Sequence, residues 1–582
     1  MSEIENRVCK LRNAMKESGL DGYIITGKDP HMGEYSPLCW RYREFITGFT
    51  GSNGMVLVTM DDGVLWTDSR YFIQAAKELE GTPFEMLREQ TDDPDVVSYI
   101  KVNMEKGSRI GVDSQSISVH SLGVLSSMLD SYEIVPTGDL VSPFWSDRPG
   151  LPDGKVELLP LSVTGESIDE KIGRIREMMD TDGVSWTLIS DLDDIAWTLN
   201  IRSSDIPYDP VFLSYLLITK SDAVLFASPD RPKGVDLPIL VESFDLMEDV
   251  LSKKAVGKGA LNFKKTAVSN FKKIRNHDVI DLNNDYPTSL KCIKNKTEIE
   301  GMKKSHVEDA LSFVNFLAKL EESGASDEME VLAMLEEERK KCPDYLSPSF
   351  GGIAGFGPNG AMCHYAPDEN AYSPIDTSGL LVLDTGGQYK TGTTDITRTL
   401  LFGKAEEKWK RAYTLVLKGH LALSNQVFPS SARGCHLDVL AKQFLWNECL
   451  DFFHGTGHGV GMRLNVHEAP VRISPALIDV KLEEGMVVSD EPGLYVEGEF
   501  GIRIENLVYV KKEKETLFGS FLSFGTLTLV PYERKLIDTS LLTKDEIKAI
   551  DSYHEMVYET LSDKLDERGR KYLEKATKPL LY

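Results

Sequence analysis

Two aspartates, Asp384 and Asp395, bracket a glycine-containing segment whose flanks resemble short strands, which predicts a β-hairpin. If the turn is centred between Tyr389 and Lys390, the two aspartates lie directly opposite each other, with Cβ atoms about 5 Å apart. Opposed like charges destabilise a hairpin, so this placement favours a cation between them or a protonated carboxyl group. The alternative is a pair of solvated carboxylates beside a turn.

A cluster of histidines follows, with His454 and His458 in the segment HGTGHGVG and His467 in VHE. Glycine at every second position lets the backbone pack closely around the imidazoles and leaves room for a ligand. A single histidine here would more often be structural, whereas three beside a glycine-rich segment favour a site. The G-x-G-x-x-G spacing of a dinucleotide loop is missing, so no nucleotide cofactor is expected.

Two glutamates extend the candidate set, Glu491 in SDEPG and Glu505 in GIRIEN. Alternation along GIRIEN places Ile502 and Ile504 on one face of a strand and Arg503 with Glu505 on the other. Glu505 then points away from the apolar layer and lies beside a fixed cation. Taken alone, it is equally consistent with a salt-bridged strand residue.

Together these side chains support the binding of divalent cations. The set offers many oxygen ligands, one imidazole and no thiolate, which favours Mn²⁺ or a similar ion over zinc in a cysteine cage. Four carboxylates exceed what one ion with an open position needs. Two cations that share bridging carboxylates would balance the charge and hold a water or hydroxide ready for hydrolysis. The candidate metal ligands are Asp384, Asp395, His458, Glu491 and Glu505.

The first 300 residues carry a weak internal repeat. The segment DGYIIT resembles a DG that is followed by WTLIS about 160 positions later. The segment VLVT resembles LLIT at the same offset. A spacing this long indicates two copies of one domain and not a solenoid. Each copy opens with a helical pattern and continues with short β-branched and aromatic runs, which predicts a mixed α/β sheet domain. Chance similarity of strand-turn-strand text is the alternative.

A proline-rich stretch at 142–160 divides the two copies, since proline withdraws ladder donors and marks linkers. A helix is expected after residue 294, because Thr297 to Glu300 has the pattern of a capping box and apolar residues recur at helical spacing until Gly324. We therefore predict domains at 1–155, 156–293 and 294–582. The third alternates strand and helix patterns and holds every candidate site residue.

Composition excludes several classes of function. The hydrophobic share of 41% and the charged share of 27% are those of a globular chain. A net charge of −26 without a basic stripe argues against nucleic acid. No apolar run reaches the ~18 residues of a membrane span, and the charged start lacks a signal-peptide core. Seven scattered cysteines are typical of reduced thiols, so we expect a soluble cytoplasmic protein.

The motifs together resemble those of the creatinase-type, or pita-bread, metallopeptidases, and in detail the eukaryotic cytosolic Xaa-Pro aminopeptidases of that family (aminopeptidase P). The similar segments are DTGGQYKTGTTDITRT, HGTGHGVG with VHE, DEPG and GIRIEN. REFITGFTGSNG, DDIAWTLNIRSSDIPYDPVF and TLVPYERKLIDTSLLTKDE extend the likeness along the chain. The resemblance implies an α+β and α/β multidomain protein, in which two creatinase-like mixed-sheet domains precede a pita-bread catalytic domain. It also implies two manganese ions and a homodimer.

The resemblance assigns roles to the metal-site residues. It implies that Asp384 binds one ion, that Asp395 and Glu505 bridge both, and that His458 and Glu491 complete the other. The implied reaction is hydrolysis of the first peptide bond of substrates with proline at the second position. Glu491 would take the proton of the attacking water.

Further roles are implied outside the ligand set. His364, His454 and His467 match the substrate-side histidines of the family, and His364 and His467 would steady the tetrahedral oxyanion and the proline side of the substrate. Arg503 would orient Glu505. A thiol nucleophile at Cys363 is disfavoured, because neighbouring strand residues point to opposite faces.

Two rival functions stay open. A prolidase uses the same ligands to split Xaa-Pro dipeptides, but prolidase-like chains are usually shorter and carry one N-terminal domain. A non-catalytic pita-bread module that binds peptides or histones loses metal ligands, whereas this sequence keeps all the matching positions. The metal-binding residues themselves do not separate an aminopeptidase from a prolidase.

Overall fold

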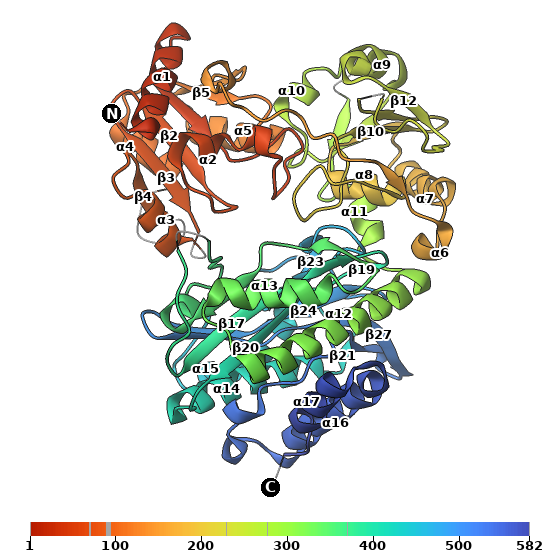
Figure 1. The fold of residues 1–582 in the computed structure, drawn as a ribbon. Helices are drawn as coiled ribbons and strands as arrows, with labels where there is room; N and C mark the ends of the chain where they lie inside the picture. Colours follow the sequence, from red (N-terminus) through yellow and green to blue (C-terminus); the bar gives the residue numbers. More distant parts are fainter. Residues whose placement is uncertain are drawn as a thin grey trace. The chain divides into compact units, whose positions relative to one another are not determined.

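A computed structural model describes residues 2–68, 71–88, 95–228, 230–275, 278–368 and 371–580 of the chain (Figure 1). The chain divides into two compact units. The first unit comprises residues 1–160 and 166–287, and the second comprises residues 161–165 and 288–582. Among the residues that the structure describes, no helix is both long and apolar enough to cross a bilayer.

The first unit contains two six-stranded sheets with the same topology. Their strand orders are β4-β3-β2-β1-β5-β6 and β12-β11-β10-β8-β13-β14. In the first sheet β2 pairs antiparallel with β1 and β3, and in the second sheet β10 pairs antiparallel with β8 and β11. All other neighbouring strands in the two sheets are parallel. The strands of the first sheet are β1 (Gly22–Ile25), β2 (Met55–Thr59), β3 (Gly63–Thr67), β4 (Glu85–Arg88), β5 (Arg109–Asp113) and β6 (Glu133–Thr137). Those of the second are β8 (Trp186–Ile189), β10 (Tyr215–Thr219), β11 (Ala223–Phe226), β12 (Leu240–Glu242), β13 (Gly259–Leu261) and β14 (Val279–Asp281).

The predicted internal repeat is confirmed by this shared topology. In the first copy Thr59, the last residue of β2, lies opposite Gly22, the first residue of β1. In the second copy Thr219, the last residue of β10, lies opposite Trp186, the first residue of β8. Both copies also open with a serine-capped helix, α1 (Glu3–Glu17) and α7 (Ile168–Thr181), each with a complete capping box. Such caps satisfy N–H groups that the first helical turn leaves without partners.

The second unit combines two larger sheets, two small sheets and several helices. One larger sheet is formed by β16 (Ile353–Phe356), β17 (Gly379–Thr385) and β20 (Ile396–Phe402). The other has the order β21 (Phe428–Pro429), β28 (Gly519–Thr526), β27 (Asn506–Thr516), β24 (Val487–Asp490), β22 (Gly457–Gly459) and β23 (Glu468–Ile473). The small sheets are β25 (Gly493–Val496) with β26 (Phe500–Arg503), and β15 (Tyr345–Pro348) with β18 (Gly387–Tyr389) and β19 (Gly392–Thr393).

Long amphipathic helices complete the core of the second unit. They are α12 (Lys296–Ser323), α13 (Glu328–Arg339), α14 (Glu407–Ser424), α15 (Gly434–Trp446), α16 (Lys544–Leu561) and α17 (Glu567–Ala576) (Figure 1). Apolar residues of α12, α13, α14 and α16 pack with Ile502 and Ile504 in one buried cluster. The predicted burial of Ile502 and Ile504 is therefore confirmed.

Helix α12 follows the predicted pattern but begins differently. Its cap is Asn295, whose side chain accepts a hydrogen bond from the N–H of Glu298, and Glu298 completes the capping box. The predicted box from Thr297 to Glu300 is wrong, because Asn295 has the extended backbone of a cap whereas Thr297 already lies in the helix. The helix ends at Gly324, as predicted, in a backbone conformation with φ of 69°.

Candidate metal centre

The hairpin that carries the two aspartates forms, but with a different register. Strands β18 and β19 pair Tyr389 with Gly392, so the turn is Lys390-Thr391 and lies one residue later than predicted. In the same register, β17 and β20 place Asp384 opposite Thr397. The prediction that Asp384 and Asp395 directly oppose each other is therefore wrong. Gly392 belongs to a strand, where a Cβ atom would come within 2.8 Å of the Met302 sulfur of α12.

The two aspartates nevertheless share one face of the hairpin. The N–H of Thr394 donates to the carbonyl of Gly387, so Asp395 continues this register and lies across from Gly386, two residues beyond Asp384. No larger residue fits at Gly386, because an added Cβ would lie 2.0 Å from the carbonyl oxygen of Thr394. This close approach brings both carboxylates to the same face of the sheet.

Three of the five predicted ligands converge closely. One ligand atom from each of Asp395, His458 and Glu505 lies within 4.8 Å of the other two. The Nε2 atom of His458 is 3.5 Å from a carboxylate oxygen of Asp395 and 3.5 Å from one of Glu491. Glu491 follows β24, and its side chain accepts a hydrogen bond from the Ser489 hydroxyl at 3.1 Å. The two larger sheets therefore deliver their acids to one place.

The orientation of His458 suits a ligand. Its Nδ1 lies 2.9 Å from the carbonyl oxygen of Gly459, which can accept only from a protonated Nδ1. Nε2, the nitrogen left to bind a metal, is then directed at the carboxylates. The ring of His467 packs edge-on against that of His458, with centroids 4.5 Å apart.

Electrostatics show that the cluster needs positive charge. Burial, followed by the carboxylates of Asp395, Asp384 and Glu491, raises the pKa of Glu505 well above its ordinary value. Burial also raises the pKa of Asp384 to about 6, although Arg503 opposes the shift. Without a cation, these carboxylates resist carrying their charges together.

His458 reports the same negative potential. Burial acts to lower the pKa of this imidazole, but hydrogen bonding to Asp395 and the charges of Glu491 and Asp395 outweigh burial and raise the pKa to about 9. The Oδ1 atom of Asp384 is buried and has no hydrogen-bond partner among the described residues. A buried, oxygen-rich cluster with an orphaned carboxylate oxygen fits divalent cations.

Arg503 lies beside Asp384 and not directly beside Glu505. Its guanidinium donates to the Asp384 carboxylate at 2.5 Å and to the Tyr495 hydroxyl at 2.7 Å. The predicted partner, Glu505, is reached only through Thr397, whose hydroxyl accepts from Arg503 at 3.2 Å and donates to Glu505 at 2.8 Å. Strand β26 ends at Arg503, so Arg503 and Glu505 do not lie on one continuous strand, and the predicted alternation does not place them side by side.

His454 lies at the end of a hydrogen-bonded chain from Arg503. The Tyr495 hydroxyl accepts from Arg503 and lies 2.9 Å from Nε2 of His454, and Nδ1 of His454 lies 2.7 Å from the carbonyl of Gly455. Burial lowers the pKa of His454 to about 4, so the imidazole is neutral. Sequence reasoning missed Tyr495, because its partner His454 lies 41 residues away and no spacing rule connects them.

His364 lies in a turn after the short 3₁₀ helix η4 (Gly357–Ala361). The strand assumed for Cys363 and His364 is therefore wrong, since the N–H of Tyr365 closes the turn onto the carbonyl of Met362 at 2.9 Å. The Cys363 thiol is close enough to Tyr495 to raise the pKa of the tyrosine, although burial is the larger cause. The segment with His364 thus borders the chain of Tyr495 and His454.

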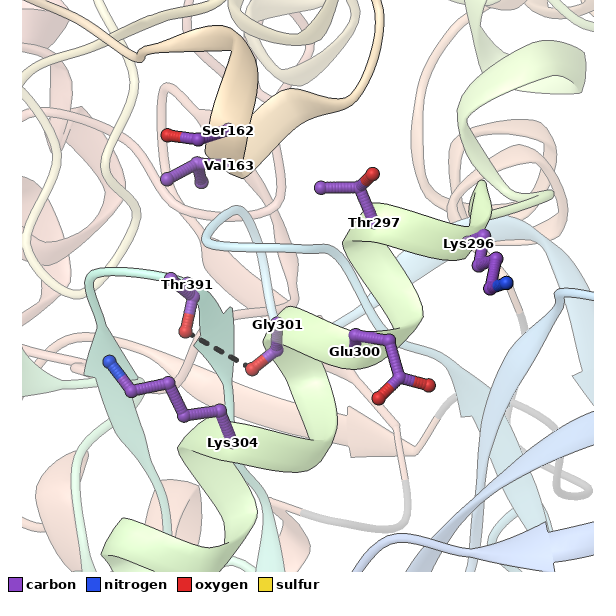
Figure 2. A pocket seen from close by; sticks show the side chains of 8 residues that line it. All are labelled: Ser162, Val163, Lys296, Thr297, Glu300, Gly301, Lys304 and Thr391. Atoms are coloured by element: carbon purple, nitrogen blue, oxygen red, sulfur yellow. Dashed lines mark hydrogen bonds between the residues drawn. The ribbon is translucent and has the colours of Figure 1, made fainter.

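A separate pocket of about 400 Å³ opens in the same unit (Figure 2). Residues of α12, the short helix α6 (Leu161–Thr164) and Thr391 line it, and none of the predicted site residues does. Of its lysines, Lys304 is already paired with Asp344 at 2.6 Å. The candidate chemistry therefore belongs to the acidic cluster and not to this pocket.

Models of known families match the chain from end to end. Metallopeptidase family M24 matches residues 300–512, and the C-terminal region of peptidase M24 matches residues 520–580. Two models of a creatinase/prolidase N-terminal domain match residues 7–144 and 147–298.

Curated relatives are similar over nearly the whole length. The probable Xaa-Pro aminopeptidase P of Botryotinia fuckeliana (strain B05.10) is 37% identical, over 99% of this chain and 92% of its own. Xaa-Pro aminopeptidase 1 of Dictyostelium discoideum is 36% identical, over 99% of this chain and 97% of its own.

Solved structures agree with these relatives. The X-prolyl aminopeptidase from Caenorhabditis elegans, described as a cytosolic enzyme with a di-nuclear active site, is 30% identical, covers 100% of both chains and has a TM-score of 0.93. The prolidase from Pyrococcus horikoshii OT3 is 25% identical and covers 62% of this chain and 99% of its own, with a TM-score of 0.51.

Proposed function

Because this chain belongs to metallopeptidase family M24 and carries two creatinase/prolidase N-terminal domains, we propose that it is an Xaa-Pro aminopeptidase. It hydrolyses the bond between the first residue of a peptide and a proline at the second position. The observation that carries this proposal is the convergence of Asp395, His458 and Glu505, with Asp384 and Glu491 at its border, in the second unit. We call this unit the catalytic unit.

Two divalent cations, Mn²⁺ in this proposal, would complete the site. Asp384, Asp395, His458, Glu491 and Glu505 would hold these ions: Asp384 on the first, His458 and Glu491 on the second, and Asp395 and Glu505 shared between them. The oxygen-rich ligand set supports manganese over zinc in a thiolate cage. When bound, the ions supply Lewis-acid chemistry, which polarises the scissile carbonyl and lowers the pKa of water.

The protein groups perform the remaining tasks. Glu491 accepts the proton of the attacking water, and its position next to His458 supports that role. His364 and His467 donate hydrogen bonds to the developing oxyanion and to the proline side of the substrate. Arg503 fixes one oxygen of Asp384 and leaves the other directed at the cations. Neutral His454, held by Tyr495, borders the substrate.

Three further features belong to this proposal. The domains are 1–155, 156–293 and 294–582, supported by the two matching sheets. The location is the cytoplasm, supported by the cytosolic description of the Caenorhabditis elegans enzyme. The protein is a homodimer, supported by apolar side chains of Trp446, Leu450 and Phe453 that are 45%, 37% and 86% exposed on the catalytic unit. A monomer in sedimentation experiments at micromolar concentration contradicts the dimer.

Product identification tests the function. The protein with Mn²⁺ is incubated with Xaa-Pro-Yaa, Xaa-Pro and Xaa-Ala-Yaa peptides. We expect the first residue to be released from Xaa-Pro-Yaa much faster than the free dipeptide is split, because two N-terminal domains precede the catalytic unit. A preference for the dipeptide favours a prolidase. Activity that a chelator does not abolish contradicts the metal mechanism, and no activity with any peptide favours a binding module.

A further inference from the structure

One buried carboxylate organises the whole segment that carries His364. Glu328 is the first residue of α13 and is 0% exposed. Its Oε1 accepts from the N–H of Phe356 at 2.6 Å and from the Asn359 amide at 3.1 Å. Its Oε2 accepts from the Tyr365 hydroxyl at 2.9 Å and from the N–H of Ser373 at 2.6 Å.

All four donors are neutral groups of one stretch of chain, residues 356–373. In the described parts of this stretch, residues 356–368 and 371–373, η4 is followed by an irregular path, so the backbone there has few ladder partners of its own. A carboxylate buried without its hydrogen bonds is strongly unfavourable, and a carboxylate accepts through both oxygens. Glu328 and the segment therefore satisfy each other.

The other side of the segment packs against the metal centre. Its Gly360 meets Gly501 of β26 so closely that a Cβ atom added to Gly501 would lie 1.7 Å from the Gly360 carbonyl oxygen. Strand β26 continues to Arg503, which binds Asp384. The segment is thus held between Glu328 on α13 and the strand that borders the acidic cluster.

We propose that Glu328 is a positioning residue for the substrate side of the site. It holds residues 356–368 and 371–373 so that His364 faces the scissile bond, and it acts on transition-state binding through His364 and not on the metal ligands. This inference rests on the proposed function. A misplacement of about 1 Å is enough to reduce a rate by about 10²-fold, so a well-packed anchor of this kind matters for catalysis.

The test is a double-mutant cycle between Glu328 and His364 in the manganese-loaded full chain. Glu328→Gln keeps the shape of the side chain but replaces one acceptor oxygen with an amide that faces donors. We expect kcat/KM for Xaa-Pro-Yaa to fall by about 10–100-fold with two metal ions still bound. His364→Ala should then cost much less in the Glu328→Gln background than in the unmodified protein, because a misplaced His364 contributes little.

Glu330→Gln is the matched control. Glu330 lies on the same helix, is exposed and accepts hydrogen bonds from Ser326, outside the segment. We expect it to leave kcat/KM unchanged and to combine additively with His364→Ala. A general loss of helix stability would affect both glutamate variants, whereas a positioning role separates them.

Several outcomes overturn the inference. The first is that the losses caused by Glu328→Gln and His364→Ala are additive. The second is an unchanged kcat/KM in Glu328→Gln, and the third is loss of metal from that variant. If Glu328→Gln does not fold, Tyr365→Phe takes its place, because it removes one donor and leaves the carboxylate intact. We then expect His364→Ala to cost less in the Tyr365→Phe background than in the unmodified protein, by a smaller margin. Failure of the unmodified protein to release any first residue overturns the proposed function as well, so the two failures are distinguishable.

Discussion

At the scale of single residues, the catalytic unit holds two acids, Glu505 and Asp384, whose pKa values are raised by burial and by nearby carboxylates. Burial and neighbouring carboxylates act together on Glu505, and burial raises the pKa of Asp384 to about 6 even though Arg503 binds it. Such an arrangement costs stability unless cations compensate it. This electrostatic cost is therefore the physical basis of the metal affinity that we propose for these side chains.

Asp395→Asn tests this basis directly. An amide cannot serve as an anionic bridging ligand, so we expect loss of bound metal and of turnover with the fold retained. Elemental analysis measures the bound metal, and the far-ultraviolet circular dichroism spectrum shows whether the fold is retained. Asp344→Asn is the control, because Asp344 pairs with Lys304 and Lys390 near the same hairpin without approaching the cluster. Full activity of Asp395→Asn with two ions bound contradicts the ligand assignment.

His364→Ala separates a chemical role from a ligand role. Losing a donor to the transition state should leave two metal ions bound and reduce kcat by about 10²–10³-fold, or ~2.7–4 kcal/mol. Loss of metal instead identifies a ligand, and a lower melting temperature at normal kcat identifies a packing role. Metal content, melting temperature and kcat on this one variant distinguish the three cases.

At the scale of elements, a buried ion pair ties two helices to the hairpin of the metal site. Asp309 of α12 accepts from Arg339 of α13 at 2.8 Å, and it also accepts from the hydroxyl of Thr394 at 3.1 Å. Arg339 donates in addition to the carbonyl of Gly386 at 3.2 Å. The pair thus contacts Gly386, two residues after Asp384, and Thr394, directly before Asp395, and it stabilises the register that brings the aspartates to one face.

Arg339→Met should therefore destabilise the catalytic unit strongly. It leaves Asp309 buried without its cation, which typically costs about 3–5 kcal/mol. Lys340→Met is the control at the next residue. It removes an exposed ion pair with Glu336 and should lower the free energy of unfolding by about 0–1 kcal/mol. Urea unfolding of both variants, together with metal retention after dialysis, measures the effect. Equal stability of the two variants is inconsistent with a role for the pair.

At the scale of the whole molecule, we expect stability and metal binding to be linked through the catalytic unit. All five candidate ligands lie in this unit, whereas the first unit consists of the two repeated sheets. Ions that bind the folded site and not the unfolded chain stabilise the folded state by mass action. Metal content should then affect the melting of the unit that holds the ligands.

Chelation tests this linkage. At a metal concentration of 100 times the Kd, binding contributes about 2.7 kcal/mol, so removal of the ions should lower the melting temperature and Mn²⁺ should restore it. Scanning calorimetry with and without a chelator measures the shift. The Asp395→Asn variant should melt at the lower temperature under both conditions. An identical transition in the unmodified protein before and after chelation removes the basis for the predicted site.

The sequence by itself determined the properties that depend on local spacing and composition. The two similar sheets follow from a repeat of about 160 positions, and helix α12 follows from its apolar period and from Gly324. The burial of Ile502 and Ile504 was predicted from alternation, although the strand itself ends at Arg503. The residue types of the ligand set were likewise enough to predict a site for divalent cations, because ligand preference is a property of the side chains.

Only the tertiary structure decided which distant residues meet. The turn at Lys390-Thr391 is set by strand pairing and by α12 packed on Gly392, which hairpin symmetry did not reveal. The partner of Arg503 is Asp384, 119 residues away, and the donors to Glu328 come from 28 to 45 residues along the chain. Such contacts depend on how sheets and helices pack around a common core, and local spacing carries no information about them.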